Sequence, residues 1–168
     1  MAQPLRPHHE VLDRVRGRHA LHRAQVPRGG ERLVAAIGCV SGAERVFERT
    51  LAYAKEREAF GRPIGRFQAI RHKFAEMATK IEAAKQFNYV VSWRYANGEY
   101  PVREITEVKL FTSRMACEVA DECVQILGGY GYMKEYEIER AYRDVRLNRI
   151  GAGTDEIMLE VIGRSYGL

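Results

Sequence analysis

Residues 31–58 have the sequence ERLVAAIGCVSGAERVFERTLAYAKERE, and this stretch decides the fold class. Its apolar side chains recur at steps of three, four or seven residues, and this spacing places them in one stripe along an α-helix. The members of the stripe are Leu33, Ile37, Val40, Phe47, Leu51 and Ala54. The stretch therefore predicts a long amphipathic helix from Glu31 to about Glu58, which ends where Gly61 and Pro63 break the pattern.

Three more segments carry the same helical periodicity: about residues 67–97, 102–127 and 137–148. Each is bounded by turns rich in Gly, Asn or Pro, which end helices. Thr154 is a natural N-cap for a last helix, because its hydroxyl can accept a hydrogen bond from an amide of the first turn. No stretch shows sustained strand alternation, so we predict an all-α, antiparallel four-helix-type bundle without a sheet.

The composition is that of a globular domain, with 168 residues, 46% hydrophobic and 29% charged. No run of eighteen apolar residues is present, which argues against a membrane span. Cys39, Cys117 and Cys123 have no metal-ligand spacing, and their odd number argues against a disulfide framework. A reduced, cytoplasmic setting is expected.

The net charge of +5 is unevenly distributed along the chain. Residues 1–30 hold six Arg against two acidic residues, whereas the remainder holds 21 Lys and Arg against 20 Asp and Glu. A nucleic-acid-binding domain usually carries its own basic face, so we do not expect nucleic acid as a partner. The opening segment lacks the apolar core of a secretory signal. We expect residues 1–30 to be a poorly ordered basic arm ahead of a helical domain at 31–168.

The residues suggest two other kinds of site. A di-metal carboxylate site could be built from four acidic residues of one predicted helix: Glu107, Glu118, Asp121 and Glu122. Such a site needs Glu-x-x-His pairs, and His72 has no Glu three residues before it, so metal binding is rejected. The turns at Gly128-Gly129 and residues 151–154 are expected to expose backbone amides, which suit phosphate or other anionic groups.

Several motifs resemble the acyl-CoA dehydrogenase family. Residues 53–68, YAKEREAFGRPIGRFQ, are similar to its Y-A-x-x-R-x-x-F-G-x-x-I…Q pattern, and residues 125–132, QILGGYGY, to its Q-x-x-G-G-x-G-Y turn. Residues 142–144 (YRD) followed by 153–157 (GTDEI) are similar to its closing segment. The resemblance covers the chain from about Glu31 onward and is to the family's C-terminal helical domain. The family's N-terminal and β domains are not in this sequence, so we expect a fragment, a truncated gene product or one half of a split enzyme.

The resemblance implies an FAD-dependent oxidoreductase that converts acyl-CoA to enoyl-CoA. In the family a glutamate removes the α-proton while a hydride leaves the β-carbon for the flavin. Many members carry this glutamate directly before the closing G-T, where this chain has Ala152. An isovaleryl- and long-chain-type subgroup carries it in an E-R-L context at the start of the first long helix, which matches Glu31-Arg32-Leu33. The resemblance thus implies Glu31 as the base; a favourable charge at a helix N-terminus is the alternative.

The remaining site residues follow from the same resemblance. Arg32 and Gly153 are expected near the acyl-CoA, and the backbone N–H of Ala152 is expected to stabilise the thioester oxygen. Arg57 is the expected pyrophosphate partner, because a guanidinium binds phosphate oxygens in bidentate fashion. The other residues expected at FAD are Phe60, Gln68, Gln125, Ile126, Leu127, Gly128, Gly129, Thr154, Asp155 and Glu156. Of these, Gln68 and residues 125–129 resemble contacts to the FAD of a neighbouring subunit.

Residues 142–144 are interpreted as structural, with an aromatic ring and an ion pair locking the last turns. The resemblance also implies a homodimer or dimer of dimers and an electron-transfer flavoprotein as acceptor, and it allows a partner chain that carries the missing domains. A non-catalytic helical interaction subunit is the main alternative. A flavin-dependent oxygenating relative is a weaker one, against which Glu31 argues.

Overall fold

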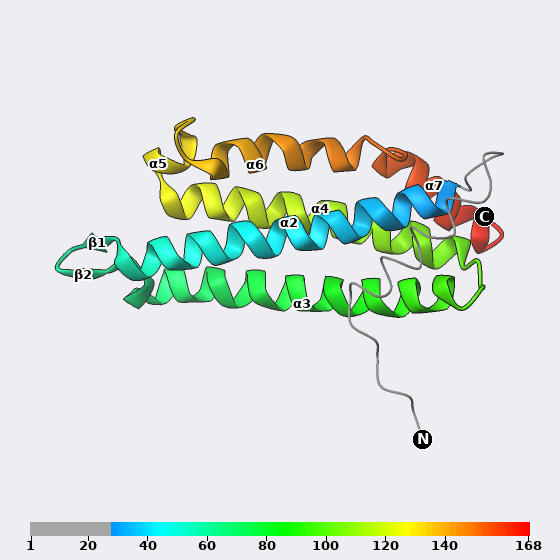
Figure 1. Cartoon of the computed structure of the whole chain (residues 1–168), viewed down its shortest axis with the longest axis horizontal. Coiled ribbons are helices and arrows are strands. Elements are labelled where there is room, and N and C mark those ends of the chain that lie inside the picture. The colour runs from blue at the N-terminus through cyan, green and yellow to red at the C-terminus, as the bar shows by residue number, and fades with distance from the viewer. Residues whose placement is uncertain (1–27) are drawn as a thin grey trace, which may run out of the picture.

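Three long helices lie side by side in the computed structural model, which describes residues 28–168 (Figure 1). They are α2 (Arg28–Glu56), α3 (Gln68–Ala96) and α4 (Val102–Leu127). Successive long helices are joined by short connections and run antiparallel, and α2 packs against both of the others. The all-α prediction is confirmed.

Shorter elements complete the bundle. Helix α6 (Glu137–Val145) and the 3-10 turn η2 (Arg146–Arg149) cover α4, and α7 (Asp155–Ser165) packs against α4 near the start of α2. At the opposite end lie a hairpin of β1 (Glu58–Ala59) and β2 (Arg62–Pro63), the turn η1 (Ile64–Arg66) and the short α5 (Gly129–Tyr132).

The predicted apolar stripe of α2 faces the core. Leu33, Ile37, Val40 and Ala54 are buried, while Phe47 and Leu51 are partly buried against the same core. The core forms two clusters along the bundle. One joins α2, α3, α4 and α6, and the other joins the start of α2 to α3 and α4. The periodicity of one helix thus anticipated which of its faces the other helices cover.

The hairpin corrects the prediction that no sheet is present. Glu58 pairs with Pro63 and Ala59 with Arg62, and the two residues between them have positive φ, 52° at Phe60 and 76° at Gly61. Two central residues with positive φ are the requirement of the tight turns that join hairpin strands. Strands of two residues are too short to leave a periodic signal in the sequence.

The first helix also begins earlier than predicted, at Arg28 rather than Glu31. Gly29 and Gly30 are poor helix formers, which is why the sequence favoured the later start. In the structure the Gly29 N–H donates to the Tyr100 hydroxyl at 3.1 Å, and a Cβ at Gly29 would lie 2.6 Å from that oxygen. Tertiary packing against Tyr100 therefore overrides the local preference. The rest of the predicted basic arm, residues 1–27, lies outside the described residues.

Candidate functional site

The predicted site residues fall into two groups at opposite ends of α2. Glu31 and Arg32 lie in its first turns, and Arg57 directly follows its last residue. At about 1.5 Å of rise per residue, the 26 steps from Glu31 to Arg57 span about 39 Å. That span exceeds an extended dinucleotide, so residues of both groups in one copy of the chain cannot contact the same FAD.

At the first end, Arg32 joins the start of α2 to the turn before α7. Its side chain is only 8% exposed. Nε donates to the Ala152 carbonyl at 3.4 Å, and Nη1 donates to Thr106 Oγ1 of α4 at 3.2 Å. Glu31, its neighbour, is exposed. The structure therefore brings together Arg32 and Ala152, which lie 120 residues apart along the chain.

The turn at residues 151–154 has a constrained backbone. Ala152 has φ of 56° and Gly153 has φ of 108°, both in the left-handed region. The φ of Gly153 favours glycine there, and a Cβ would also lie 2.5 Å from Met158 Cε, the far end of a flexible side chain that would have to shift. The Ala152 N–H donates no hydrogen bond to any described residue, and Ala152 is exposed. An oriented amide donor is thus available to an external acceptor.

Lys109 of α4 lies beneath this turn and was not predicted. It is 1% exposed, and its ammonium donates to the Gly153 carbonyl. Burial lowers the pKa of the Lys109 ammonium, and the charge of Asp155 opposes that shift only in part. A signal was present in the sequence, because Lys109 follows Ile105 by four residues and precedes Thr112 by three. A lysine on an inward helical face is unusual.

Asp155, expected at the cofactor, has its side chain turned into the protein. It is 4% exposed, and its Oδ2 accepts from Arg149 Nε at 2.8 Å and from Arg114 Nε at 3.1 Å. Burial would raise the pKa of the Asp155 carboxyl, but the bonds from Arg149 and Arg114 outweigh it and lower the pKa. The carboxylate thus anchors the start of α7 to α4 and η2. Because it is buried, it does not form part of the outer surface of the turn.

The N-cap predicted at Thr154 is confirmed. The Thr154 hydroxyl accepts from the Ile157 N–H at 3.4 Å, and α7 begins at the next residue. Glu156 is exposed at the same helix start. Hydrogen bonds from its own backbone amide and from the Thr154 hydroxyl lower the pKa of the Glu156 carboxyl. Thr154 and Glu156 are therefore the polar side chains that this turn presents outward.

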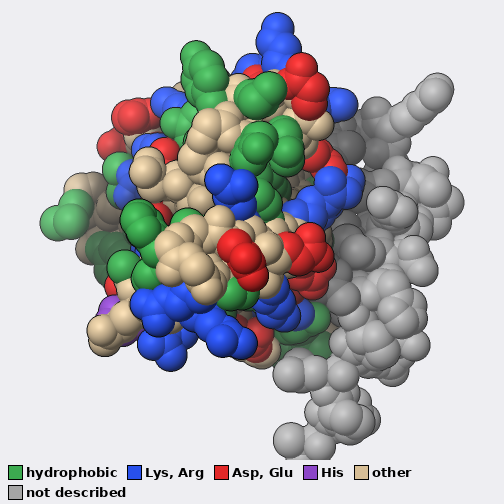
Figure 2. Space-filling model, turned by 90° about the vertical axis from the view of Figure 1, so that its left-hand side faces the viewer, with side chains coloured by type: hydrophobic (Ala, Val, Ile, Leu, Met, Phe, Trp, Pro, Cys, Tyr) green, Lys and Arg blue, Asp and Glu red, His purple; other side chains and the backbone are tan. Residues whose placement is uncertain are grey.

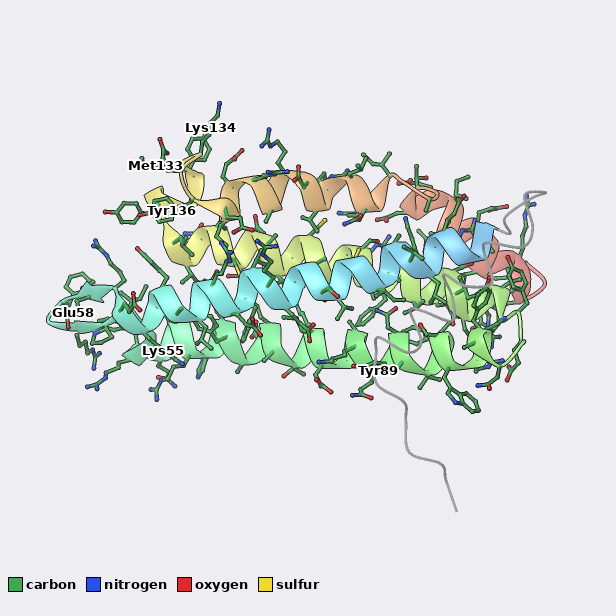
Figure 3. All side chains as sticks on the ribbon, viewed as in Figure 1. Lys55, Glu58, Tyr89, Met133, Lys134 and Tyr136 are labelled. Carbon is green, nitrogen blue, oxygen red and sulfur yellow. The ribbon has the colours of Figure 1, made fainter. Side chains whose placement is uncertain are left out.

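At the other end, Arg57 lies in an open groove of about 530 Å³ formed by α2, η1, the end of α4 and α5. Its guanidinium stands 5.8 Å from the centre of the Tyr130 ring, and Gly128 and Gly129 form part of the same wall. Figure 3 shows Lys55 and Glu58 at this end together with Met133 and Tyr136, which come from distant parts of the sequence. Lys and Arg side chains gather on part of this end, as Figure 2 shows.

One expectation for this groove needs correction. The Gly128 N–H donates to the carbonyls of Val124 and Gln125, so it caps α4 and is not free for a ligand. Gly129 begins α5, and the first amides of a helix have no partner within it. The side chains of Gln68, Gln125 and Phe60 are exposed, with Phe60 96% exposed. Those of Ile126 and Leu127 are buried in the core, so their contribution to the groove wall is small.

These two ends carry motifs that identify the chain. Residues 21–167 match the family described as "Acyl-CoA dehydrogenase, C-terminal domain". The chain belongs to the acyl-CoA dehydrogenase family. The resemblance predicted from the motifs is confirmed, and the match begins ten residues before the predicted domain boundary at Glu31.

Relatives within the acyl-CoA dehydrogenase family are similar along most of this chain. "Probable acyl-CoA dehydrogenase YngJ" of Bacillus subtilis (strain 168) is 44% identical over 136 residues, which are 81% of this chain and 36% of that protein. "Isovaleryl-CoA dehydrogenase, mitochondrial" of Oryza sativa subsp. japonica is 41% identical over 134 residues, 80% of this chain and 33% of that protein. The crystal structure of an acyl-CoA dehydrogenase from Geobacillus kaustophilus shares 42% identity at a TM-score of 0.83, over 84% of this chain and 37% of that one. This chain thus spans about a third of the length of these acyl-CoA dehydrogenases.

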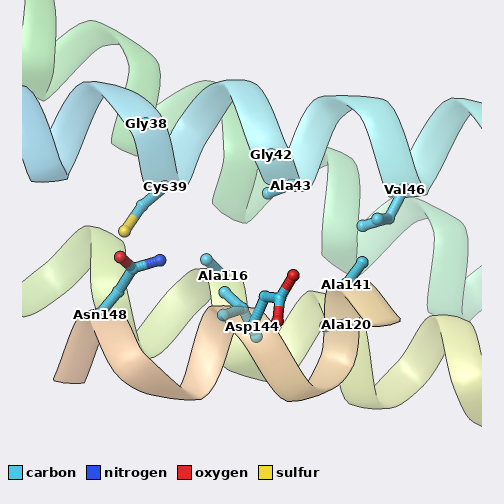
Figure 4. A pocket seen from close by; sticks show the side chains of 11 residues that line it. Gly38, Cys39, Gly42, Ala43, Val46, Ala116, Ala120, Ala141, Asp144 and Asn148 are labelled. Atoms are coloured by element: carbon cyan, nitrogen blue, oxygen red, sulfur yellow. The ribbon is translucent and has the colours of Figure 1, made fainter. Parts of the chain in front are cut away.

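A further hollow of about 340 Å³ lies between α2, α4 and α6 of this acyl-CoA dehydrogenase domain. Figure 4 shows Gly38 and Gly42 on its α2 side, with Cys39 and Asn148 facing each other across it. The glycines and alanines that line it have too little side-chain volume to fill the space. None of the predicted site residues lines this hollow, so it is separate from both ends.

The interpretation of residues 142–144 as a lock for the last turns is wrong in its details. Arg143 pairs with Glu139 and Asp144 with Arg140, each one turn away on α6, and three of these four side chains are more than 60% exposed. Such pairs contribute little to stability. The ion pairs of Asp155 hold the last turns instead.

The described residues contain no group of three or more His, Cys, Asp or Glu side chains arranged to hold a metal ion. Within residues 28–168 no helix is long and apolar enough to cross a membrane.

Proposed function

We propose that this chain supplies the base, the thioester-oxygen donor and part of the FAD-binding surface of an acyl-CoA dehydrogenase. The observation that supports the proposal is the contact between Arg32 and the Ala152 carbonyl, because Glu31 is the residue before Arg32 in the chain and the Ala152 N–H donates to no described residue. A base and an amide donor at one place are what removal of a proton next to a thioester carbonyl requires.

Glu31 accepts the α-proton of the acyl-CoA in this proposal. Its exposure supports the role, because a group that takes a substrate proton must be reachable from outside the helix bundle. Arg32 is already committed to Ala152 and Thr106, so we propose that it orders the start of α2 and adds positive charge beneath the substrate.

The Ala152 N–H donates to the thioester oxygen, which gains negative charge as the α-proton leaves. A donor that is already oriented in the free protein costs no reorganisation when that charge develops. An amide performs this role with any side chain. The presence of Ala152 where other members carry a glutamate therefore leaves the oxygen site intact.

FAD, when bound, supplies the acceptor for the hydride that leaves the β-carbon. Two surfaces of this chain fit such a cofactor: the groove with Arg57 and Gly129 at one end, and Thr154 with Glu156 at the other. Arg57 suits the pyrophosphate, because a guanidinium makes two parallel bonds to phosphate oxygens. Because the two surfaces are about 39 Å apart along α2, we propose that each FAD lies between the first end of one copy and the groove of a second.

Exposed apolar side chains support assembly of this kind. Val90 and Trp93 of α3 and Phe111 of α4 are between 41% and 52% exposed, and Phe111 borders an apolar groove with Leu110 and Ile162. Where exposed apolar side chains form a contiguous patch, they mark an interaction site. We propose a homodimer or dimer of dimers, with an electron-transfer flavoprotein as electron acceptor. A cytoplasmic location is also proposed, because all three cysteines are free and two of them are buried.

The test is Glu31→Gln in the FAD-loaded enzyme reconstituted with the chain or chains that complete the site. Glutamine keeps the shape but cannot accept the α-proton. Acyl-CoA should then bind with nearly unchanged affinity, while flavin bleaching slows by about a thousandfold or more, since each tenfold is about 1.4 kcal/mol of barrier. Glu48→Gln is the matched control, because Glu48 is also exposed on α2 and lies away from the first turn.

Bleaching of the Glu31→Gln enzyme at close to the parental rate would show that Glu31 is only a helix-terminal charge. A parental assembly that binds no FAD and is not bleached by any acyl-CoA would instead favour a non-catalytic helical subunit.

A further inference from the structure

A pocket of about 400 Å³ lies at the hairpin end of the bundle, between the end of α2, β2, η1 and the start of α3. Three of the residues that line it carry a charge, and all three are cations: Lys55, Arg66 and Arg71. Glu56 and Glu58 are the acidic residues nearest Lys55 in the sequence, and neither lines the pocket. The pocket, here called the η1 pocket, thus presents three positive charges and no negative one.

The η1 pocket is separate from the groove that holds Arg57. The two hollows have no lining residue in common. Figure 3 shows Lys55 on the α3 side of α2, while Met133 and Tyr136 lie on the opposite side, next to α5. Figure 2 shows Lys and Arg side chains gathered in the lower part of this end, which is the α3 side in Figure 1. An anion in the η1 pocket would therefore not occupy the place proposed for the FAD pyrophosphate.

The three cations of the η1 pocket form no ion pair with any described residue. Lysines farther along α3 do form such pairs, with glutamates of α2 or α4; they are Lys73, Lys80 and Lys85. The bundle therefore pairs cations that lie opposite glutamates of a neighbouring helix, but it leaves three unpaired cations together around the η1 pocket.

Charge does not favour this grouping in the free protein. Arg71 is the fourth residue of α3, and the dipole of a helix puts partial positive charge at its N-terminus. The first turn of α3 has no acidic residue to offset that charge. Like charges around one pocket also repel, although water weakens the repulsion because all three side chains are exposed. An anion in the pocket would relieve both effects.

The backbone that carries two of the cations is closely packed. A Cβ at Gly65 would lie 3.0 Å from the Ala54 carbonyl oxygen, so η1 lies directly against α2. Lys55 follows Ala54 in the sequence, and Arg66 follows Gly65. The backbone positions of Lys55 and Arg66 are thus held beside each other before any ligand binds, which lowers the entropy cost of binding.

The donors of the η1 pocket suit a phosphate better than a carboxylate. Two guanidinium groups and one ammonium offer more charge and more N–H donors than a single carboxylate can pair with. A phosphate monoester carries close to two negative charges at neutral pH and has three strong acceptor oxygens, which a guanidinium can bind in bidentate fashion. The rest of the wall is apolar and can cover the carbon part of a phosphate ester; it includes Leu51, Ala54, Pro63 and Phe74.

We propose that the η1 pocket is a phosphate-binding site, which takes either free inorganic phosphate groups or the phosphates of an ester such as a nucleotide. Lys55, Arg66 and Arg71 bind the phosphate oxygens. The site is independent of the proposed acyl-CoA dehydrogenase function, because it uses none of the residues assigned to FAD or to acyl-CoA.

The test is isothermal titration calorimetry of the 168-residue chain with inorganic pyrophosphate. Three charge-assisted contacts that each contribute about tenfold give an expected Kd of about 1 mM. Arg66→Gln and Arg71→Gln should each weaken binding by about tenfold, because glutamine is polar but carries no charge. Arg140→Gln is the matched control: Arg140 is exposed on α6, outside the η1 pocket, and its loss should leave the Kd unchanged.

Several results would overturn the proposal. One is a parental chain that binds no pyrophosphate at millimolar concentration, and another is equal weakening in the Arg140→Gln chain. Loss of binding in an Arg57→Gln chain but not in Arg66→Gln would place the anion in the groove instead. The Tm of Arg66→Gln and Arg71→Gln should equal or slightly exceed that of the parental chain, because repulsion is relieved. A clear fall in Tm would show that these arginines support the fold.

Titration with ADP distinguishes the two sources of phosphate. A Kd for ADP about tenfold lower than that for pyrophosphate, and raised by Arg66→Gln and Arg71→Gln, would assign a phosphate ester whose carbon part contacts the apolar wall. Equal or weaker binding of ADP would assign free inorganic phosphate groups.

Discussion

Replacing Asp155 by asparagine removes one negative charge from the junction of α4, η2 and α7 with little change in shape. The carboxylate oxygen Oδ2 accepts from Arg149 Nη2 at 2.6 Å and Nε at 2.8 Å, and from Arg114 Nε at 3.1 Å. The partners lie 6 and 41 residues away, so the change affects both a local turn and the packing of α7 on α4.

The loss of stability expected for Asp155→Asn depends on how exposed its two arginine partners are. Hydrogen bonds to charged groups contribute roughly 1.5–3 kcal/mol each when buried. The side chains of Arg149 and Arg114 are 35% and 41% exposed, so water stabilises them after the charge is lost. The asparagine oxygen also remains an acceptor. We therefore expect Asp155→Asn to lower the free energy of unfolding by about 2 kcal/mol, which lowers Tm by about 4–8 °C in a domain of this size.

The pH dependence gives a sharper test, because the pKa of the folded Asp155 carboxyl is lowered. A carboxyl of this kind stabilises the fold fully above its unfolded pKa, about 4. That contribution is lost as the pH falls through the lower pKa of the folded state. The difference in Tm between the parental chain and Asp155→Asn, measured by circular dichroism, should therefore be constant from pH 7 to 5 and shrink below about pH 4. Equal Tm values at pH 7, or a difference that grows on acidification, would refute the reasoning.

Two further outcomes test the turn and the core. Gly153→Ala should lower the free energy of unfolding by about 1–3 kcal/mol in urea titrations, because it combines a left-handed φ of 108° with a Cβ 2.5 Å from Met158 Cε. Gly163→Ala in α7, where a Cβ meets nothing within 4 Å, should be neutral or stabilising, and equal stability of the two variants would contradict this account. Burial raises the pKa of the Cys39 and Cys123 thiols to about 11. Iodoacetamide at pH 8 should accordingly label the half-buried Cys117 first, and rapid labelling of Cys39 in the folded chain, seen by peptide mass spectrometry, would count against the packing of α2.

The helices and their order were determined by the sequence alone. Apolar residues at helical spacing require a shared face, and Gly or Pro between the segments prevents one continuous helix. The bounds of α4 agree with the prediction to the residue, and the Thr154 cap was predictable because its hydroxyl serves an amide three positions away. These features are local. The motifs likewise sufficed to recognise the family, because they consist of residue types at fixed spacings.

Contacts between distant residues were decided only by the tertiary structure. Arg32 meets the Ala152 carbonyl across 120 residues, and Lys109 meets the Gly153 carbonyl across 44. Whether a charged side chain is desolvated or hydrated depends on which helices close over it. The sequence therefore placed Asp155 at a ligand surface, while packing buried it between two arginines. The start of α2 at Arg28 has the same origin: local propensity disfavours Gly29 in a helix, and only the hydroxyl of Tyr100, 71 residues away, supplies the partner that holds it there.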